Sequence, residues 1–214
     1  MTRKLIIAPH VDDEVLGCGG IIDDNTFVIH CGLSDNQKHG NKYFTREQRL
    51  LEFEKIKKVT GCKSRLLQGN HVNKFSAHDM ISDIEKEINT FLPDIVFIPT
   101  PSYNQDHKEV YKASIIALRP HDINYFVPKI LMYEQPQDLW YGDDRQFSPN
   151  VFIEIDIEKK IMLYKCLESQ VRNHRGTDTI ASIAAIRGSQ SNCKHAEAFK
   201  SIRWKIKEKF YKDI

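Results

Sequence analysis

The segment 9–14 concentrates groups that bind metal ions. It reads Pro-His-Val-Asp-Asp-Glu and places the imidazole of His10 and the carboxylates of Asp12 and Asp13 within four positions. Histidine nitrogens and carboxylate oxygens are the ligands that zinc and similar divalent cations take. A plainer interpretation is that Asp12 or Asp13 caps the helix that follows, while His10 is a solvated loop residue. Taken alone, the segment does not decide between a metal site and a helix cap.

A second polar cluster, Asn104-Gln105-Asp106-His107, follows the apolar run at residues 94–99 and leads into a predicted helix. His107 offers another imidazole to a metal that His10 and an aspartate would hold. Two histidines and one carboxylate, with a position open for water, are the ligand set of hydrolytic zinc sites. The residues therefore favour a metal hydrolase. The alternative is a nucleotide- or sugar-binding protein whose acidic loops only cap helices.

The elements that must bring these clusters together are short apolar runs that alternate with amphipathic segments, the pattern of a mainly parallel sheet. Strands are predicted at residues 4–8, 26–31, 64–68, 94–99 and 129–133, with an edge strand from residue 151. Helices are predicted at residues 14–22, 45–60, 77–91 and 108–118. The fold class is therefore α/β and Rossmann-like. In such a sheet the loops at the carboxyl ends of the strands face one crevice, so the two polar clusters should meet there.

Two of these helices carry informative residues. Gly17, Gly19 and Gly20 lie in the first helix, where each costs about 1 kcal/mol relative to alanine. Something must therefore approach the backbone of this helix closely, either the sheet or a ligand. In the helix at 45–60, Thr45 and Gln48 are spaced as a capping box.

The sequence changes character after residue 158. Helical and loop segments dominate, and no further strand is predicted. We expect residues 158–214 to form a helical C-terminal extension, a cap on a single domain that spans residues 1–214. The stretch 194–214 has seven lysines and arginines and three acidic residues, which predicts a solvated terminal helix or, alternatively, a surface that attracts a phosphorylated substrate.

Composition excludes several classes of protein. The chain has 214 residues, of which 41% are hydrophobic, enough to fill the core of a folded domain. A net charge of +2 gives no reason to expect a nucleic-acid partner. No window approaches the roughly 20 apolar residues of a membrane span, and the first residues do not form a signal peptide, so we expect a cytoplasmic protein. Five scattered cysteines without a CxxC pair indicate free thiols.

The motifs also resemble a known family. APHVDDEVLGCGG resembles the A-H-P-D-D-E signature of the LmbE-like, or PIG-L, de-N-acetylases, and NQDH resembles their second motif, H-P-D-H. RLLEFEKIKKVTG, LPDIVFIP and RGSQSNCKHAEAFKSIR are similar to further family segments spread along the chain. The resemblance implies a Rossmann-like three-layer sandwich and a zinc-dependent hydrolase. Such an enzyme removes the acetyl group from an N-acetylated amino sugar or glycoconjugate.

Carried over by position, the resemblance assigns roles to individual residues. His10, Asp13 and His107 would be the zinc ligands, although iron(II), cobalt or nickel suits the same nitrogen and oxygen donors. Asp12 would be the general base that takes a proton from the attacking water and later delivers one to the leaving amine. Asp106 would lie behind the ligands and orient its neighbours.

The chain departs from the family pattern at two positions in these motifs. Val11 replaces the usual proline, which should loosen the turn without removing a ligand. Asn104 stands where many members have a histidine that stabilises the tetrahedral intermediate. An asparagine amide can still donate a hydrogen bond to an oxyanion, so Asn104 is a candidate catalytic residue, but it cannot act as a charged acid.

Substrate contacts are less well defined. Arg49 falls on a helix that lines the pocket in the family, and His195 and Glu197 fall in a segment that the resemblance places near it. Arg49 could equally be a solvated helix residue. Trp140 and Tyr141 could form an aromatic wall for a sugar ring or simply anchor their loop. The expected substrate is a small N-acetyl sugar, free or carried on a nucleotide or lipid. A non-catalytic nucleotide-sugar-binding domain, an amidase acting on a non-sugar amine, and a homo-oligomer remain open.

Overall fold

The computed structural model describes residues 1–33, 37–39, 42–140 and 147–206; Tyr141 and the end of the basic C-terminal stretch lie outside this part. Its main sheet has seven strands. They are β1 (Lys4–Ala8), β2 (Thr26–His30), β5 (Lys63–Leu66), β6 (Ile95–Pro99), β7 (Lys129–Tyr133), β8 (Val151–Glu154) and β9 (Ala196–Trp204). The strand order is β5-β2-β1-β6-β7-β9-β8, and β3 (Gln37–His39) pairs with β4 (Lys42–Phe44) in a separate hairpin.

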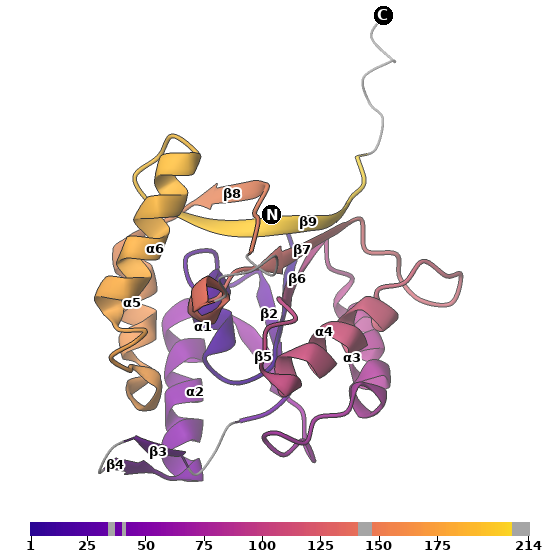
Figure 1. The fold of residues 1–214 in the computed structure, drawn as a ribbon. Coiled ribbons are helices and arrows are strands. Elements are labelled where there is room, and N and C mark those ends of the chain that lie inside the picture. Colours follow the sequence, from indigo (N-terminus) through magenta and orange to yellow (C-terminus); the bar gives the residue numbers. More distant parts are fainter. Residues whose placement is uncertain (34–36, 40–41, 141–146, 207–214) are drawn as a thin grey trace, which may run out of the picture.

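Helices cover both faces of this sheet (Figure 1). They are α1 (Asp13–Cys18), α2 (Arg46–Thr60), α3 (Ala77–Phe91), α4 (Gln105–Ala117), α5 (Ile157–Lys165) and α6 (Thr177–Gln190), with 3-10 turns at Pro136–Trp140 and Glu168–Gln170. Helices α3 and α4 lie on one side, and α1, α2, α5 and α6 lie on the other. The expected three-layer α/β sandwich is therefore confirmed. No helix in the described residues is long and apolar enough to cross a membrane.

The first strand shows how the sequence produces two cores. Successive side chains of a strand point to opposite faces. Leu5 and Ile7 accordingly pack in the cluster that includes α3 and α4, whereas Ile6 and Ala8 pack in the cluster on the α1 side. All four side chains are fully buried. A strand that is apolar on both faces belongs in the interior of a parallel sheet, and β1 pairs in parallel with both β2 and β6.

The expected close approach at the first helix is present. A Cβ atom placed on Gly17 would lie 2.2 Å from the ring of Tyr133, so no larger residue fits there without movement. The hydroxyl of Tyr133 donates to the carbonyl oxygen of Ile7 over 3.0 Å and fixes the ring against the sheet. The capping box at the start of α2 is also present, because the side chain of Thr45 accepts from Gln48 and the Gln48 side chain accepts from Thr45.

The expectation that no strand follows residue 158 is wrong. Helices α5 and α6 are present, but β9 runs antiparallel to both β7 and β8 and fills the gap between them. The segment predicted as part of a solvated terminal helix therefore supplies an interior strand over residues 196–204. Its first four residues, Ala-Glu-Ala-Phe, are buried, while in the rest exposed Lys200, Ile202 and Trp204 alternate with the partly buried Ser201 and Arg203. Strand formation here depends on tertiary pairing, because alanine, glutamate and lysine have low intrinsic β-propensity. Strand β8 lies at the sheet edge, as expected.

Candidate metal centre

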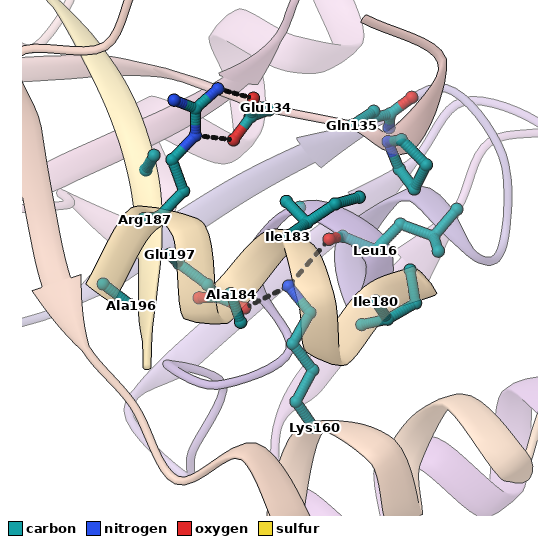
Figure 2. Close-up of a pocket in the computed structure, with 13 residues that line it drawn as sticks. Leu16, Glu134, Gln135, Lys160, Ile180, Ile183, Ala184, Arg187, Ala196 and Glu197 are labelled. Carbon is teal, nitrogen blue, oxygen red and sulfur yellow. Dashed lines mark hydrogen bonds and ion pairs between the residues drawn. The ribbon is translucent and has the colours of Figure 1, made fainter. Parts of the chain in front are cut away.

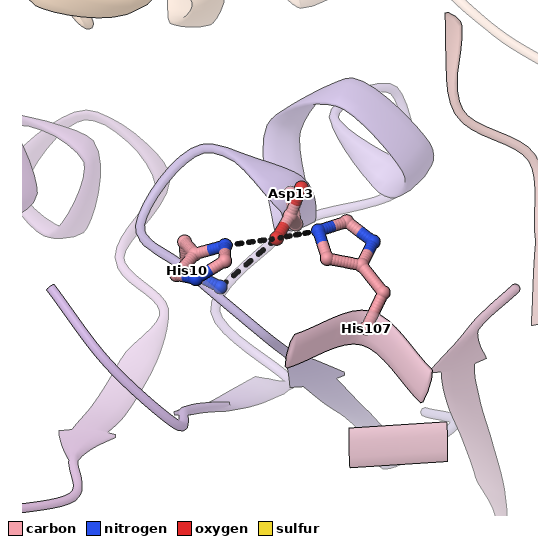
Figure 3. Close-up of side chains that lie close together, drawn as sticks. All are labelled: His10, Asp13 and His107. Atoms are coloured by element: carbon pink, nitrogen blue, oxygen red, sulfur yellow. Dashed lines mark hydrogen bonds and ion pairs between the residues drawn. The ribbon is translucent and has the colours of Figure 1, made fainter. Parts of the chain in front are cut away.

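Three side chains predicted as metal ligands converge at the carboxyl ends of β1 and β6 (Figure 3). The Oδ2 atom of Asp13 lies 3.5 Å from Nδ1 of His10 and 3.3 Å from Nε2 of His107. One candidate ligand atom from each residue lies within 4.8 Å of the others, and all three residues are buried. In a tetrahedral zinc site with bonds of about 2.1 Å, neighbouring ligand atoms are about 3.4 Å apart. The donor set therefore fits a divalent cation.

The sheet topology explains why these residues meet. From β1 the chain proceeds outward through β2 to β5, then returns to the other side of β1 to form β6 and β7. This reversal creates a crevice beside β1 at the carboxyl ends of the strands. His10 and Asp13 lie in the turn after β1. Helix α4 begins at Gln105, three residues earlier than expected, so His107 lies in its first turn and faces that crevice.

Further groups hold the candidate ligands in place. Asp106 Oδ2 lies 3.0 Å from His10 Nε2 and accepts from the backbone amide of Asn73 over 2.8 Å. Asp13 accepts at Oδ1 from the Gln135 side chain over 2.8 Å, and at Oδ2 from the His10 amide over 2.9 Å. A carboxylate behind a histidine fixes the ring and leaves its other nitrogen available to a metal. Here that nitrogen is Nδ1 of His10.

The electrostatics of the cluster also suit a cation. Burial opposes protonation of His10, but hydrogen bonds that its ring donates to Asp106 and Asp13 outweigh this effect and raise the pKa to about 9. Burial acts to raise the pKa of Asp13, but the imidazoles of His107 and His10 outweigh it and keep the carboxyl ionised. Burial lowers the pKa of His107 and favours its neutral, ligating form. A cation that binds here would displace the proton of His10, so binding is coupled to proton release.

Asp12 lies beside these residues at the start of α1. It occupies the N-cap position, and its side chain makes no capping hydrogen bond. Its Oδ2 atom instead accepts from the guanidinium of Arg175 over 2.9 Å. Asp12 also lines a cavity of about 190 Å³ together with His10, Asp13 and His107. The remaining walls are formed by Val72, Tyr103, Asn104, Gln137, Trp140, Gln170, Arg172, His174 and Arg175.

The side chain of Asn104 can use its oxygen and its nitrogen for different purposes. Its Oδ1 atom accepts from the backbone amide of Asp106 over 2.9 Å and so caps α4. The residue also lines the cavity, and its amide nitrogen is the donor that a bound group could use.

The structure does not place Arg49 among the described residues that line this cavity, as the expected substrate contact would require. Its side chain is fully buried. The guanidinium donates to the backbone carbonyl of Val11, to Glu52 over 2.5 Å and to Ser169 over 2.8 Å. Since Val11 lies between His10 and Asp12, Arg49 ties the turn that carries these two residues to the segment that begins at Ser169. The sequence motif therefore identifies a residue that supports the site, but Arg49 does so from behind the cavity wall, by holding the backbone at Val11.

His195 and Glu197 are also not among the described residues that line this cavity, so their assignment as substrate contacts is corrected. Glu197 is buried in β9 and accepts from Lys160 Nζ over 2.7 Å (Figure 2). It also accepts from the amide of Gly20 over 2.8 Å. The backbone carbonyl of His195 accepts from Ile155 where β9 joins the sheet. The missed strand explains the error, because sheet pairing draws these residues inward.

The sequence analysis missed the cationic turn at residues 172–175. Arg172, His174 and Arg175 all line the cavity, and His174 packs edge-on against Trp140 with ring centroids 5.3 Å apart. Trp140 in turn stacks on Tyr103, with centroids 5.6 Å apart and an interplanar angle of 27°. The available signal was the run Arg-Asn-His-Arg-Gly in a segment otherwise predicted to be a cap.

Comparisons with known proteins agree with this geometry. Residues 5–118, just over half of the chain, match the family model PIG-L: GlcNAc-PI de-N-acetylase. The uncharacterized deacetylase YaiS of Escherichia coli (strain K12) is 27% identical over 170 residues, which cover 72% of this chain and 82% of that protein.

Two solved structures have the same fold. The N,N'-diacetylchitobiose deacetylase of Pyrococcus horikoshii superposes with a TM-score of 0.76 at 18% identity, covering 94% of this chain and 84% of that one. GalB, the 4-carboxy-2-hydroxymuconate hydratase of Pseudomonas putida KT2440, superposes with a TM-score of 0.77 at 19% identity, covering 97% and 99%. At this identity the two structures show the fold. The family match, which includes both polar clusters, establishes that the chain belongs to the PIG-L, or LmbE-like, family of de-N-acetylases.

Proposed function

We propose that the chain is a divalent-metal-dependent hydrolase that removes the acetyl group from an N-acetylated amino sugar or glycoconjugate. The observation that carries the proposal is the convergence of His10, Asp13 and His107 beside Asp12 in one cavity. Zinc is the expected ion, while iron(II), cobalt and nickel suit the same donors. When bound, the ion would lower the pKa of a water molecule and polarise the acetyl carbonyl.

The chain's own residues supply the remaining steps. Asp12 takes a proton from the attacking water and returns one to the nitrogen of the leaving amine as the amide C–N bond breaks. Arg175 holds one oxygen of that carboxylate at 2.9 Å and thereby orients it. Asn104 Nδ2 donates to the oxygen that becomes negatively charged in the tetrahedral intermediate. Asp106 and Gln135 maintain the orientation of His10 and Asp13.

A sugar is the favoured carrier of the acetamido group. The rings of Tyr103 and Trp140 are each about half exposed and stack side by side at the cavity, where they offer an apolar surface to the face of a pyranose. This feature favours a sugar over a simple N-acyl amine. The fold by itself does not decide the reaction, because GalB, a hydratase, has it too.

The proposal is tested by measuring bound metal and acetate release on the same preparation. Protein purified without chelator should contain about one divalent ion per chain and should release acetate from N-acetyl sugars. Removal of the ion should abolish release, and added zinc, iron(II), cobalt or nickel should restore it. A non-catalytic sugar-binding domain would bind the sugars without releasing acetate. Preferential hydrolysis of simple N-acetyl amines would identify the non-sugar amidase instead.

A further inference from the structure

Glu14 is a buried carboxylate that the proposed mechanism does not use. It lies in the first turn of α1, two residues after Asp12, and it is fully buried. Burying a carboxylate is unfavourable unless hydrogen bonds or an opposite charge compensate for the lost hydration. The contacts of the Glu14 side chain therefore indicate what it does in the fold.

The carboxylate of Glu14 reaches back to the backbone of the proposed general base. Its Oε2 atom accepts from the Asp12 amide over 3.0 Å, and the same amide also donates to the carbonyl of His10 over 3.1 Å. On the other side of Asp12, its carbonyl accepts from the amides of Val15 and Leu16 in α1. Glu14 thus helps to fix the peptide bond that precedes Asp12.

This contact is one half of a capping box. In a complete box the N-cap side chain accepts from an amide of the first turn, and a side chain of that turn accepts from the N-cap amide. Helix α2 has both halves, at Thr45 and Gln48. Asp12 occupies the N-cap position of α1, but its side chain makes no capping bond and instead accepts from Arg175 over 2.9 Å. Glu14 therefore holds the turn while the Asp12 carboxylate stays available to the cavity that it lines.

The neighbouring strand supports the Glu14 side chain. His30 is the last residue of β2 and lies beside Ala8, the last residue of β1. Its Nε2 atom lies 3.2 Å from Oε2 of Glu14, and its ring packs edge-on against Phe53 of α2, with ring centroids 5.1 Å apart. Both His30 and Phe53 are buried. A group that positions another must itself be fixed, and these contacts confine the Glu14 carboxylate between β2 and the Asp12 amide.

We propose that Glu14 is a positioning residue for Asp12: its carboxylate holds the Asp12 backbone so that the Asp12 side chain meets the attacking water in the orientation that proton transfer requires. The inference rests on the proposed function and adds a residue to it. Glu14 is not among the described residues that line the cavity, so its effect on the reaction passes through Asp12. The alternative is that the contact contributes only to the stability of α1.

The first test removes the acceptor from position 14 in metal-loaded enzyme. Glu14→Met fills a similar volume without an acceptor and should lower kcat about 10- to 100-fold for the N-acetyl sugar that the wild type hydrolyses fastest, with metal content and KM nearly unchanged. Glu14→Gln keeps an oxygen acceptor and should retain most of the rate. Glu14→Asp withdraws the carboxylate from the Asp12 amide, should show the same loss, and replaces Glu14→Met if that variant does not fold.

A matched control is available in β9. Glu197 is also a buried glutamate that accepts from a backbone amide, that of Gly20. Glu197→Met should lose stability but keep kcat per folded molecule. A wild-type kcat in both Glu14→Met and Glu14→Asp, or an equal loss of kcat in Glu197→Met, would reject the proposal. Loss of bound metal in the Glu14 variants would also reject it, because the effect would then pass through Asp13.

A double-mutant cycle identifies the group through which Glu14 acts. If that group is Asp12, Glu14→Met should reduce the residual rate of Asp12→Asn by less than about threefold. Losses that multiply would show that the two residues act independently, and would reject the positioning role.

A measurement without turnover separates failure of this inference from failure of the proposed function. If no N-acetyl sugar is hydrolysed, the deacetylase proposal fails, and amide hydrogen exchange by NMR still decides whether Glu14 holds Asp12. In Glu14→Met the Asp12 amide should exchange at least about 10-fold faster than in the wild type, and Glu14→Gln should restore its protection. The Leu16 amide, bonded to the Asp12 carbonyl over 2.9 Å, should change less. Unchanged exchange at Asp12, or equal acceleration at Leu16, would reject the contact.

Discussion

Two buried clusters of charged residues differ in how their charges are compensated. In the cluster of Figure 2, Arg187 makes two hydrogen bonds to Glu134, and Lys160 pairs with Glu197 at 2.7 Å and donates to the Leu16 carbonyl. The cavity between them is about 20 Å³, room for roughly one water molecule. Opposite charges are matched within the protein.

The candidate metal centre of His10, Asp13 and His107 has a different charge balance. His10, Asp13 and His107 aim their donor atoms at one another across gaps that suit an ion, and the adjoining cavity of about 190 Å³ is large enough for a ligand. Arg172 and Arg175 line the same cavity, and Arg175 pairs with Asp12. Burial of charge alone therefore does not identify a functional site. The distinguishing feature is a set of side chains spaced as the ligands of an ion that the chain does not itself supply.

The largest expected effect follows from removing a candidate metal ligand. His10→Ala and His107→Ala should each reduce bound metal and lower acetate release to background, because the ion is expected to contribute several kcal/mol of transition-state stabilisation. Metal content by elemental analysis and activity should fall together. Full activity in a variant that no longer holds metal would contradict the assignment.

Replacement of the proposed base should separate chemistry from metal binding. Asp12→Asn keeps the shape of the side chain but cannot take a proton, so kcat should fall about 10²- to 10⁴-fold with metal content unchanged. Elemental analysis of the same preparation provides the control. A near-native rate in this variant would show that Asp12 is not the base.

A smaller loss is expected at Asn104. Asn104→Ala removes one neutral donor, which should lower kcat by at most about 10²- to 10³-fold and by less than Asp12→Asn does. The change also removes the cap of α4, at a cost of about 1 kcal/mol in the free energy of unfolding. Asn104→Asp retains the cap oxygen but removes the donor, so it should keep stability and still lose rate.

The cluster of Figure 2 should show the opposite response, a loss of stability without a loss of activity. Glu197→Ala leaves Lys160 buried without its carboxylate and should reduce the free energy of unfolding by about 3–5 kcal/mol, while kcat per folded molecule stays unchanged. The double variant Lys160→Met with Glu197→Leu should recover most of that stability. A selective loss of kcat in Glu197→Ala would restore this residue as a candidate at the active site.

A pH effect should be traceable to Asp138. Burial raises the pKa of this carboxyl to about 7, although hydrogen bonds from Gln135 and Thr100 oppose the rise. Because the folded state holds the proton more tightly than the unfolded state, the contribution to stability is present below about pH 4 and is lost as the pH rises through about 7. Asp138→Asn should reduce this part of the decline, as measured by thermal unfolding from pH 4 to 8.

Local patterns predicted much of this structure from the sequence. The run at residues 4–8 is apolar on both faces and forms β1, and the capping box identifies the start of α2. The loops after β1 and β6 meet because strand direction and sheet order require it. These features depend on neighbouring residues or on general rules of the fold, so they can be predicted from a single sequence.

The remaining features depend on contacts that are remote in the sequence. Strand β9 is stabilised by pairing with β7 and β8, and its composition does not reveal that pairing. Arg49 looks like a surface or pocket residue until the carbonyl of Val11 and the side chain of Ser169 are seen to surround it. The cationic turn gains its significance from Asp12, which lies 163 positions away from Arg175. No local sequence pattern indicates contacts between residues so far apart in the chain.

Strand β9 also has a consequence for synthesis of the chain. His10, Asp13 and His107 are translated long before residues 196–204, yet β8 has β9 as its sheet partner, and one edge of β7 is covered by β9 as well. A nascent chain that stops short of β9 therefore carries all three candidate ligands, while β7 and β8 each lack the neighbour that β9 provides. Exposed edges of this kind promote intermolecular strand addition, so truncation within residues 196–204 should yield aggregates for chaperones and proteases rather than a less active enzyme.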